Sequence, residues 1–255
     1  MRLLFASALA FLVVATAAPA AGVQLKIIFP EGYSVRQMAD QVSGVRQIAI
    51  HKRHVTPVLT GTAYARAAAT TARPAGFPRG RNIEGFLFPA GYVFGPSTSA
   101  AELIALQLQT FESEWGKVEL GARRPYDILR VASMIERETR APEERKLVSA
   151  VIWNRLAKGM PLQIDATLRY GLGIQGTLPI KVAQQRNPTP YNTSLHKGLP
   201  PTPISNPGLP SLLAAAHPAG VDYLYYVRKP DKKHHFFTAS AEEFCKKAAE
   251  YGYHC

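Results

Sequence analysis

The sequence predicts an α+β fold, in which a small N-terminal strand-and-helix subdomain precedes a larger mixed α+β domain. Two observations support this class. Strand-like and helix-like segments do not alternate regularly, as βαβ units would require, and no internal repeat is visible. The 255 residues, of which 47% are hydrophobic, suffice for one large domain or two small ones with a packed core.

The small subdomain contains the first elements of the chain. Residues 23–30 alternate and are rich in β-branched side chains, which is typical of a strand. After a turn, Ser34 can cap a helix over 35–42, because apolar residues recur there at helical spacing. A further helix is expected near 62–70, and the Pro- and Gly-containing residues 72–80 indicate a linker.

The larger domain begins with an aromatic-rich strand and turn over residues 83–94. Ser97 or Ser99 can cap the helix that follows. Pro- and Gly-rich loops fill 187–210. The other expected elements are helices over 100–115, 126–140, 142–158, 209–216 and 241–251, and strands over 223–228 and 235–238.

The net charge of +12 predicts an acidic partner, such as nucleic acid, an anionic membrane surface or a carboxylate-bearing polymer. General solubility explains the charge equally well. Residues 3–24 form an uncharged, largely apolar run with small-residue cleavage sites. We therefore expect residues 1–22 to be a secretory signal peptide or, alternatively, an uncleaved membrane anchor. Either segment places the body outside the cytoplasm, which argues against a nucleic-acid partner.

The two cysteines, Cys245 and Cys255, both lie near the C-terminal end. In an oxidising compartment they could form a disulfide that holds the tail, and two free thiols are the alternative. No metal-ligand spacing involves them, so we expect neither a metal site nor a cofactor.

Two glutamates, Glu136 and Glu138, are the first candidates for chemistry. They end a helix whose apolar stripe comprises Ile128, Val131, Ala132 and Ile135. Residues two apart are separated by about 200° around a helix, so the two carboxyl groups point to opposite sides. A carboxyl group against an apolar wall keeps its proton near neutral pH, as the general acid of glycosidic-bond cleavage must. Spacing does not choose between them, and both could instead be solvated partners of nearby arginines.

A polar loop with Gln163, Asp165 and Thr167 is the second candidate, because these side chains can hydrogen-bond sugar hydroxyls or amides. Ordinary turn chemistry is the alternative. Residues 187–193 combine a tyrosine hydroxyl, an amide and stiff prolines, which suits a rigid binding wall or a plain surface loop. No G-x-S-x-G motif is present, so a covalent serine hydrolase is not indicated.

These segments together carry a family resemblance over about residues 83–238. The matching motifs lie at 84–92, 132–139, 154–156, 159–165, 170–171, 189–193, 198–201, 203–204, 206–208, 214–218 and 223–227. In order and content they resemble the endolytic murein transglycosylase (MltG/YceG-like) family. This family cuts peptidoglycan glycan strands between N-acetylmuramic acid (MurNAc) and N-acetylglucosamine (GlcNAc), and leaves a 1,6-anhydroMurNAc end.

The resemblance also implies roles for single residues. Glu138 matches the second glutamate of the Glu-x-Glu-Thr motif, which is the catalytic residue, acting as general acid and then as base. Glu136 matches the first glutamate and is expected to support it. The positions that the resemblance assigns to substrate binding are Glu136, Gln163, Asp165, Thr167, Tyr191, Asn192 and His234.

By the same resemblance, residues 23–80 would be a shortened LysM-like subdomain with its linker, and 81–255 the transglycosylase catalytic domain. The expected partners are peptidoglycan glycan strands, cell-wall synthases and, through an uncleaved N-terminal segment, the inner membrane. The expected location is the periplasm or the extracytoplasmic face of the bacterial inner membrane. A non-catalytic peptidoglycan-binding or scaffold protein of the cell-wall synthesis machinery is the alternative function, which the short N-terminal region and basic charge permit.

Overall fold

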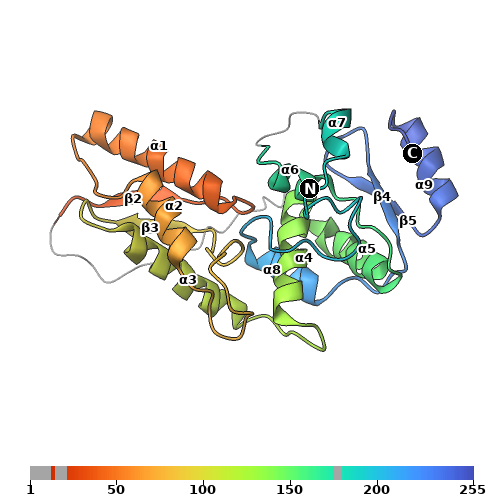
Figure 1. Ribbon diagram of the computed structural model, residues 1–255, viewed down its shortest axis with the longest axis horizontal. Coiled ribbons are helices and arrows are strands. Elements are labelled where there is room, and N and C mark those ends of the chain that lie inside the picture. The colour runs from red at the N-terminus through yellow and green to blue at the C-terminus, as the bar shows by residue number, and fades with distance from the viewer. Residues whose placement is uncertain (1–12, 15–21, 175–179) are drawn as a thin grey trace, which may run out of the picture.

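The computed structural model describes residues 13–14, 22–174 and 180–255. Its elements form two groups that lie side by side along the long axis of the molecule (Figure 1). The N-terminal group comprises β1 (Val13–Val14), β2 (Leu25–Ile28), α1 (Val35–Arg53), α2 (Gly61–Thr70), β3 (Gly91–Phe94) and α3 (Ala100–Trp115). The mixture of helices with small sheets confirms the predicted α+β class.

A three-stranded sheet organises the N-terminal group. β2 is antiparallel to β3, with Leu25 opposite Phe94, and β1 is parallel to β3. Leu25 and Ile27 are buried while their neighbours are exposed, as expected for a strand with one face on the core. Because β3 and α3 belong to this group, it extends past residue 80, the expected boundary before the catalytic domain.

The helix α1 begins where the sequence predicts and runs further. Ser34 forms a capping box, in which its hydroxyl accepts from the Gln37 amide and the Gln37 side chain accepts from the Ser34 amide. The predicted end near residue 42 was wrong, since the helix continues to Arg53 and stops at His54, which has a φ of 54°. The apolar spacing continues through Val45 and Ala49, so the sequence carried a signal for the longer helix that the prediction did not use.

The C-terminal group surrounds α4, which packs against α5, α6 and α8. A two-stranded antiparallel sheet of β4 and β5 and the last helix complete the group (Figure 1). Its elements are α4 (Pro125–Glu138), the 3-10 turn η1 (Pro142–Glu144), α5 (Arg145–Ala157), α6 (Asp165–Gly171), α7 (Val182–Gln185), α8 (Leu209–Ala216), β4 (Tyr225–Arg228), β5 (His235–Thr238) and α9 (Ala241–Glu250).

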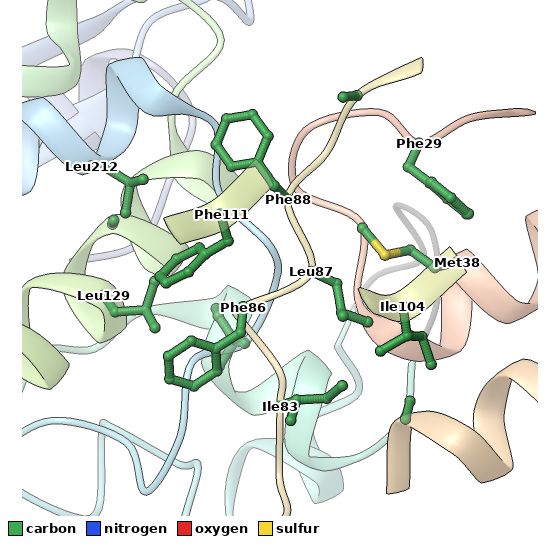
Figure 2. Close-up of a cluster of buried hydrophobic side chains, with 14 of the residues drawn as sticks. Phe29, Met38, Ile83, Phe86, Leu87, Phe88, Ile104, Phe111, Leu129 and Leu212 are labelled. Atoms are coloured by element: carbon green, nitrogen blue, oxygen red, sulfur yellow. The ribbon is translucent and has the colours of Figure 1, made fainter. Parts of the chain in front are cut away.

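The segment before β3 joins the two groups through the core. Figure 2 shows it passing between two sets of side chains, with Leu87 on the side of Met38 and Ile104. Phe86 lies on the other side, where its ring packs edge-on against Phe111 at 5.2 Å between centroids. All these side chains are buried. The hydrophobic core is therefore continuous between the groups, which fixes their relative position.

Two further findings concern the cysteines and the helices of the described residues. Cys245 and Cys255 are joined in a disulfide that ties α9 to the end of the chain, which settles the alternative that the sequence leaves open. Over the described ranges, no helix is both long enough and apolar enough to cross a membrane. Apart from residues 13–14 and 22, the predicted signal or anchor segment lies outside the described residues.

Candidate active site

Glu138 is the last residue of α4. The chain leaves the helix at Thr139, whose φ of −98° and ψ of 123° are extended. The apolar stripe predicted for this helix is fully buried, so one face of α4 is fixed in the core and the orientation of its end is set. The carboxyl of Glu138 is partly buried and lies beside the negative end of the helix dipole, which disfavours its anion.

Three elements meet at this carboxyl. The Tyr226 hydroxyl on β4 donates to Glu138 Oε2 at 3.1 Å. Burial is the main cause that raises the pKa of Glu138, and the neighbouring Asp165 carboxylate at the start of α6 raises it further. The Tyr226 hydroxyl, the Arg228 guanidinium and the Ala166 amide oppose this rise. The net upward shift in pKa means that Glu138 holds its proton at higher pH than an ordinary glutamate.

The ring of Tyr226 packs against a histidine that is itself held in place. His235 on β5 packs edge-on against it, with 5.3 Å between ring centroids. His235 in turn pairs with the buried Glu144, whose carboxylate accepts from the His235 amide at 2.9 Å and lies 2.7 Å from Nδ1. Rotation of the histidine is thereby prevented, and Tyr226 keeps its hydroxyl directed at Glu138.

Arg155 positions the loop that carries Gln163. Its guanidinium donates to Gln163 Oε1 at 2.9 Å and to the carbonyl of Leu224 just before β4 at 2.6 Å. Gln163 has a φ of 55° and an exposed side chain. One buried guanidinium therefore sets the distance between this loop and β4 on the two sides of Glu138.

The prediction that residues 163–167 form a polar loop was only partly right. Asp165 and Thr167 lie in α6, a helix too short to show periodicity. Asp165 is exposed next to Glu138, but Thr167 is buried and bonds the Ile164 carbonyl at 2.6 Å and the Thr193 hydroxyl at 2.9 Å. Thr167 thus joins two loops, and its contact with substrate stays a prediction.

Tyr191 and Asn192 lie in the proline-containing loop that packs against α6. The Tyr191 hydroxyl hydrogen-bonds Thr202 at 2.8 Å, and its ring packs edge-on against Tyr170. Asn192 is buried and donates to the carbonyls of Gln185 and Asn187, both at 2.9 Å. These bonds stiffen the wall, as its prolines predict, and direct substrate contacts by either residue stay predictions.

The other two residues in the predicted set lie away from the Glu138 carboxyl. Glu136 accepts from the Gly208 amide before α8 at 3.1 Å and lies 3.9 Å from Arg145. His234 lies between Asp231, at 2.7 Å, and Glu143, at 3.1 Å. Its pKa is raised mainly by the bond to Asp231. Glu136 and Glu138 thus face different sides of α4, as their spacing predicts.

Sequence reasoning missed the residues that surround Glu138 from β4 and β5. Tyr226 is 88 positions away from Glu138, and Arg228 and His235 are equally remote. The strands themselves were predicted, but nothing local indicates which face of a two-stranded sheet meets α4. Only the three-dimensional structure brings Tyr226 and Arg228 to the carboxyl, with His235 packed against Tyr226.

A pocket of about 550 Å³ lies next to this site, between the start of α1 and the end of α6. Ala166 lines it, and Arg137 adjoins it from the turn before Glu138. At its inner end is Glu84, which is 4% exposed and accepts from the Val35 amide, the Tyr170 hydroxyl and Asn206. Burial raises the pKa of Glu84 to about 8. Within the described ranges no group of His, Cys, Asp and Glu side chains could hold a metal ion.

Known proteins resemble this chain over most of its length. A family model described as the YceG-like family matches residues 7–250, and the chain therefore belongs to that family. Individual proteins that resemble the chain come from bacteria. A protein of Bacillus subtilis (strain 168) named "Endolytic murein transglycosylase" is 35% identical over 177 residues, which cover 66% of this chain and 48% of that protein.

A protein of the same name from Streptococcus pneumoniae serotype 2 (strain D39) is 29% identical over 177 residues, which cover 66% of this chain and 32% of the relative. The chain thus spans about half the length of the first relative and about a third of the second. A crystal structure of a YceG-like protein from Listeria monocytogenes matches with a TM-score of 0.67 and 29% identity. The match covers 91% of this chain and 77% of that one.

Proposed function

We propose that the chain is an endolytic peptidoglycan transglycosylase that cleaves the MurNAc–GlcNAc bond and leaves 1,6-anhydroMurNAc ends. The observation that carries the proposal is the carboxyl of Glu138, which ends a buried helix and has a raised pKa while Asp165, Tyr226 and Arg228 surround it. The names of the relatives support peptidoglycan as the substrate.

The proposed mechanism needs one carboxyl group that acts twice. Protonated Glu138 donates to the glycosidic oxygen as the bond to C1 of MurNAc breaks, and the GlcNAc product leaves with that proton. The Glu138 carboxylate then removes the proton from the C6 hydroxyl of the same MurNAc, whose oxygen attacks C1 and closes the anhydro ring. Water is not consumed. The donors around Glu138 stabilise its transient anion, and its burial favours return of the proton.

Asp165 is the residue that could change this outcome. A hydrolase needs a second carboxylate, either to activate water or to attack C1, and Asp165 is the acidic neighbour of Glu138. In the proposed reaction it instead raises the pKa of Glu138 and stabilises positive charge that develops on the sugar ring.

Product analysis tests the proposal directly. Purified glycan strands incubated with the protein should yield fragments 18 mass units (one water) lighter than hydrolysis products, with anhydro ends detected by mass spectrometry. Internal cleavage should give a spread of lengths rather than single disaccharides. Reducing ends would instead indicate a hydrolase with Asp165 as base. Intact strands that nevertheless bind the protein would favour the non-catalytic scaffold.

Removing the Tyr226 hydroxyl should change the pH dependence of cleavage. Tyr226→Phe deletes a donor that favours the Glu138 anion, so the pKa of Glu138 rises further. We expect the alkaline limb of the kcat/KM profile to move to higher pH, because that limb reports the acid in the free enzyme. The matched control is Tyr225→Phe, whose side chain lies on the opposite face of β4 and packs against Phe244. An unmoved limb in Tyr226→Phe would separate Tyr226 from the acid.

We also propose that the protein works outside the cytoplasm, in the periplasm or at the outer face of the inner membrane, next to cell-wall synthases. The disulfide between Cys245 and Cys255 supports this location, because such bonds persist in oxidising compartments. Peptidoglycan lies in the same compartment.

A further inference from the structure

The pocket beside the active site has a distinct chemical character. Arginines line it from three different elements: Arg36 in the first turn of α1, Arg137 near the end of α4, and Arg169 on α6. Its volume of about 550 Å³ is within the range of roughly 300–1,000 Å³ typical of small-molecule sites. Such a pocket has room for a group larger than a simple ion.

The positive charge of the pocket is not balanced from within. Glu84 is the one carboxyl group among its described lining residues, and it lies at the buried end with its oxygens bonded to Val35, Tyr170 and Asn206. Because burial raises the pKa of Glu84 to about 8, this group is largely neutral at pH 7. Among the described lining residues, no ionised carboxylate therefore faces the three guanidinium groups.

Two details of the pocket favour the binding of an anion. Nη1 of Arg169 is buried and has no hydrogen-bond partner in the described part of the chain, which is costly for a charged donor. Arg36 places a cation in the first turn of a 19-residue helix, where the helix dipole favours an anion, and that turn contains no acidic residue. A bound carboxylate would offset both costs.

We propose that this pocket binds a carboxylate-bearing stem peptide of peptidoglycan, attached to the muramic residue on which Glu138 acts. The inference rests on the proposed function and names the part of the substrate that its neighbouring pocket takes. Its position supports this, because Ala166 lines the pocket and its amide also favours the Glu138 anion. A substituent on the sugar at Glu138 could thus reach the pocket directly.

The remaining lining suits a peptide better than a bare phosphate. Aliphatic side chains of Val35, Leu172 and Ile204 and the rings of Tyr170 and Tyr191 share the walls with the arginines. Aliphatic and aromatic surface would bind the backbone and methyl groups of alanine residues, while planar guanidinium groups pair with carboxylates in two-bond geometry.

Binding to a cleavage-deficient protein tests the inference without relying on catalysis. The protein carries Glu138→Gln, and the probe is a soluble MurNAc-peptide, compared by calorimetry with the same compound with its carboxylates amidated. We expect Arg169→Gln to weaken binding of the free-acid probe about tenfold or more, in line with loss of one charge-assisted pair. Arg66→Gln, at an exposed position on α2, removes the same charge elsewhere and should leave the affinity unchanged.

The results that would overturn this inference differ from the results that would overturn the proposed function. Equal binding of the free-acid and amidated probes, equal binding by Arg169→Gln and its parent, or no binding of either probe would each overturn the inference. Cleavage by the otherwise unmodified protein is then compared on strands with and without stem peptides. The inference expects Arg169→Gln to raise KM only for peptide-bearing strands, whereas failure to cleave either kind would refute the proposed function alone.

Discussion

Replacing Glu138 by glutamine should reduce cleavage of glycan strands at least about 100-fold, since a positioned general acid contributes roughly 100- to 10,000-fold to a rate. Glutamine has nearly the same shape and its oxygen can still accept from the Tyr226 hydroxyl, so the contact at 3.1 Å is kept. It has no proton to donate to a leaving sugar. The loss should appear in kcat, measured from anhydro ends released, with an unchanged circular dichroism spectrum.

The matched control is Glu136→Gln, the same substitution two residues earlier on α4. Glu136 accepts from the Gly208 amide and lies near Arg145, so this change should lower stability while kcat falls less than about tenfold. If Glu136→Gln abolished cleavage and Glu138→Gln did not, the acid would be assigned to the wrong glutamate.

The same Glu138 variant has a predictable effect on stability. Folding raises the pKa of Glu138 above its ordinary 4.5. At pH values between 4.5 and the pKa in the native state, the native protein therefore binds more protons than the unfolded chain. The free energy of unfolding contributed by this group therefore falls as pH rises through that window. Glu138→Gln lacks this penalty, and its stability relative to the parent should increase from pH 4 to pH 8 in denaturant titrations. A constant difference would mean that burial does not shift this pKa.

Local sequence signals predicted the helices whose ends are marked by residues next to those ends. Ser99 and Glu102 form a capping box, so the helix over 100–115 was predicted with its observed ends. The helix over 209–216 was also predicted with its observed ends, and a proline lies in its first turn. By contrast, α6 has seven residues and no side-chain cap, and its start at Asp165 looks like a polar loop in the sequence.

Sequence patterns likewise indicated some residues of the candidate site and not others. Glu138 could be named as a candidate because an apolar stripe and a family motif coincide on one helix. The importance of Glu84 was hidden, because a glutamate among aromatic residues near a turn gives no sign of what approaches it. Its partners come from residues 35, 170 and 206, and such contacts depend on how the two groups of elements pack. Sequence patterns that describe one element at a time do not contain this information.

Asn206 should prove the most sensitive residue for stability. It is 0% exposed, and its Oδ1 accepts from the amides of Gly85 and Leu87, both at 2.9 Å. Its Nδ2 donates to the Tyr33 carbonyl and to Glu84, again at 2.9 Å. Gly85 has a φ of 94°, and a Cβ there would lie 2.7 Å from Pro203, so this turn packs closely against the Pro203 ring and requires glycine.

Asn206→Ala therefore leaves two buried amides without an acceptor and removes a donor from Glu84. At about 1–3 kcal/mol for each orphaned group, we expect a loss of roughly 3–5 kcal/mol in the free energy of unfolding. For a chain of this size, that corresponds to about a 10 °C fall in Tm. Differential scanning calorimetry measures it, and a fall below about 2 °C would show that water or a shifted side chain replaces the amide.

Asn206→Asp separates the acceptor role from the donor role. The aspartate keeps an oxygen for Gly85 and Leu87 but sets a second carboxyl group beside Glu84, whose pKa burial raises to about 8. Near pH 4 both groups hold protons, and one can donate to the other, so the cost should be small. As pH rises towards 8 the pair must share one proton or repel, and the stability deficit relative to the parent should widen.

The control is Asn82→Asp, at an exposed position whose side-chain oxygen already accepts from the Glu84 amide at 2.9 Å. Its stability deficit should not widen with pH. A deficit in Asn206→Asp that is the same at every pH would mean that the cost lies in shape and not in charge.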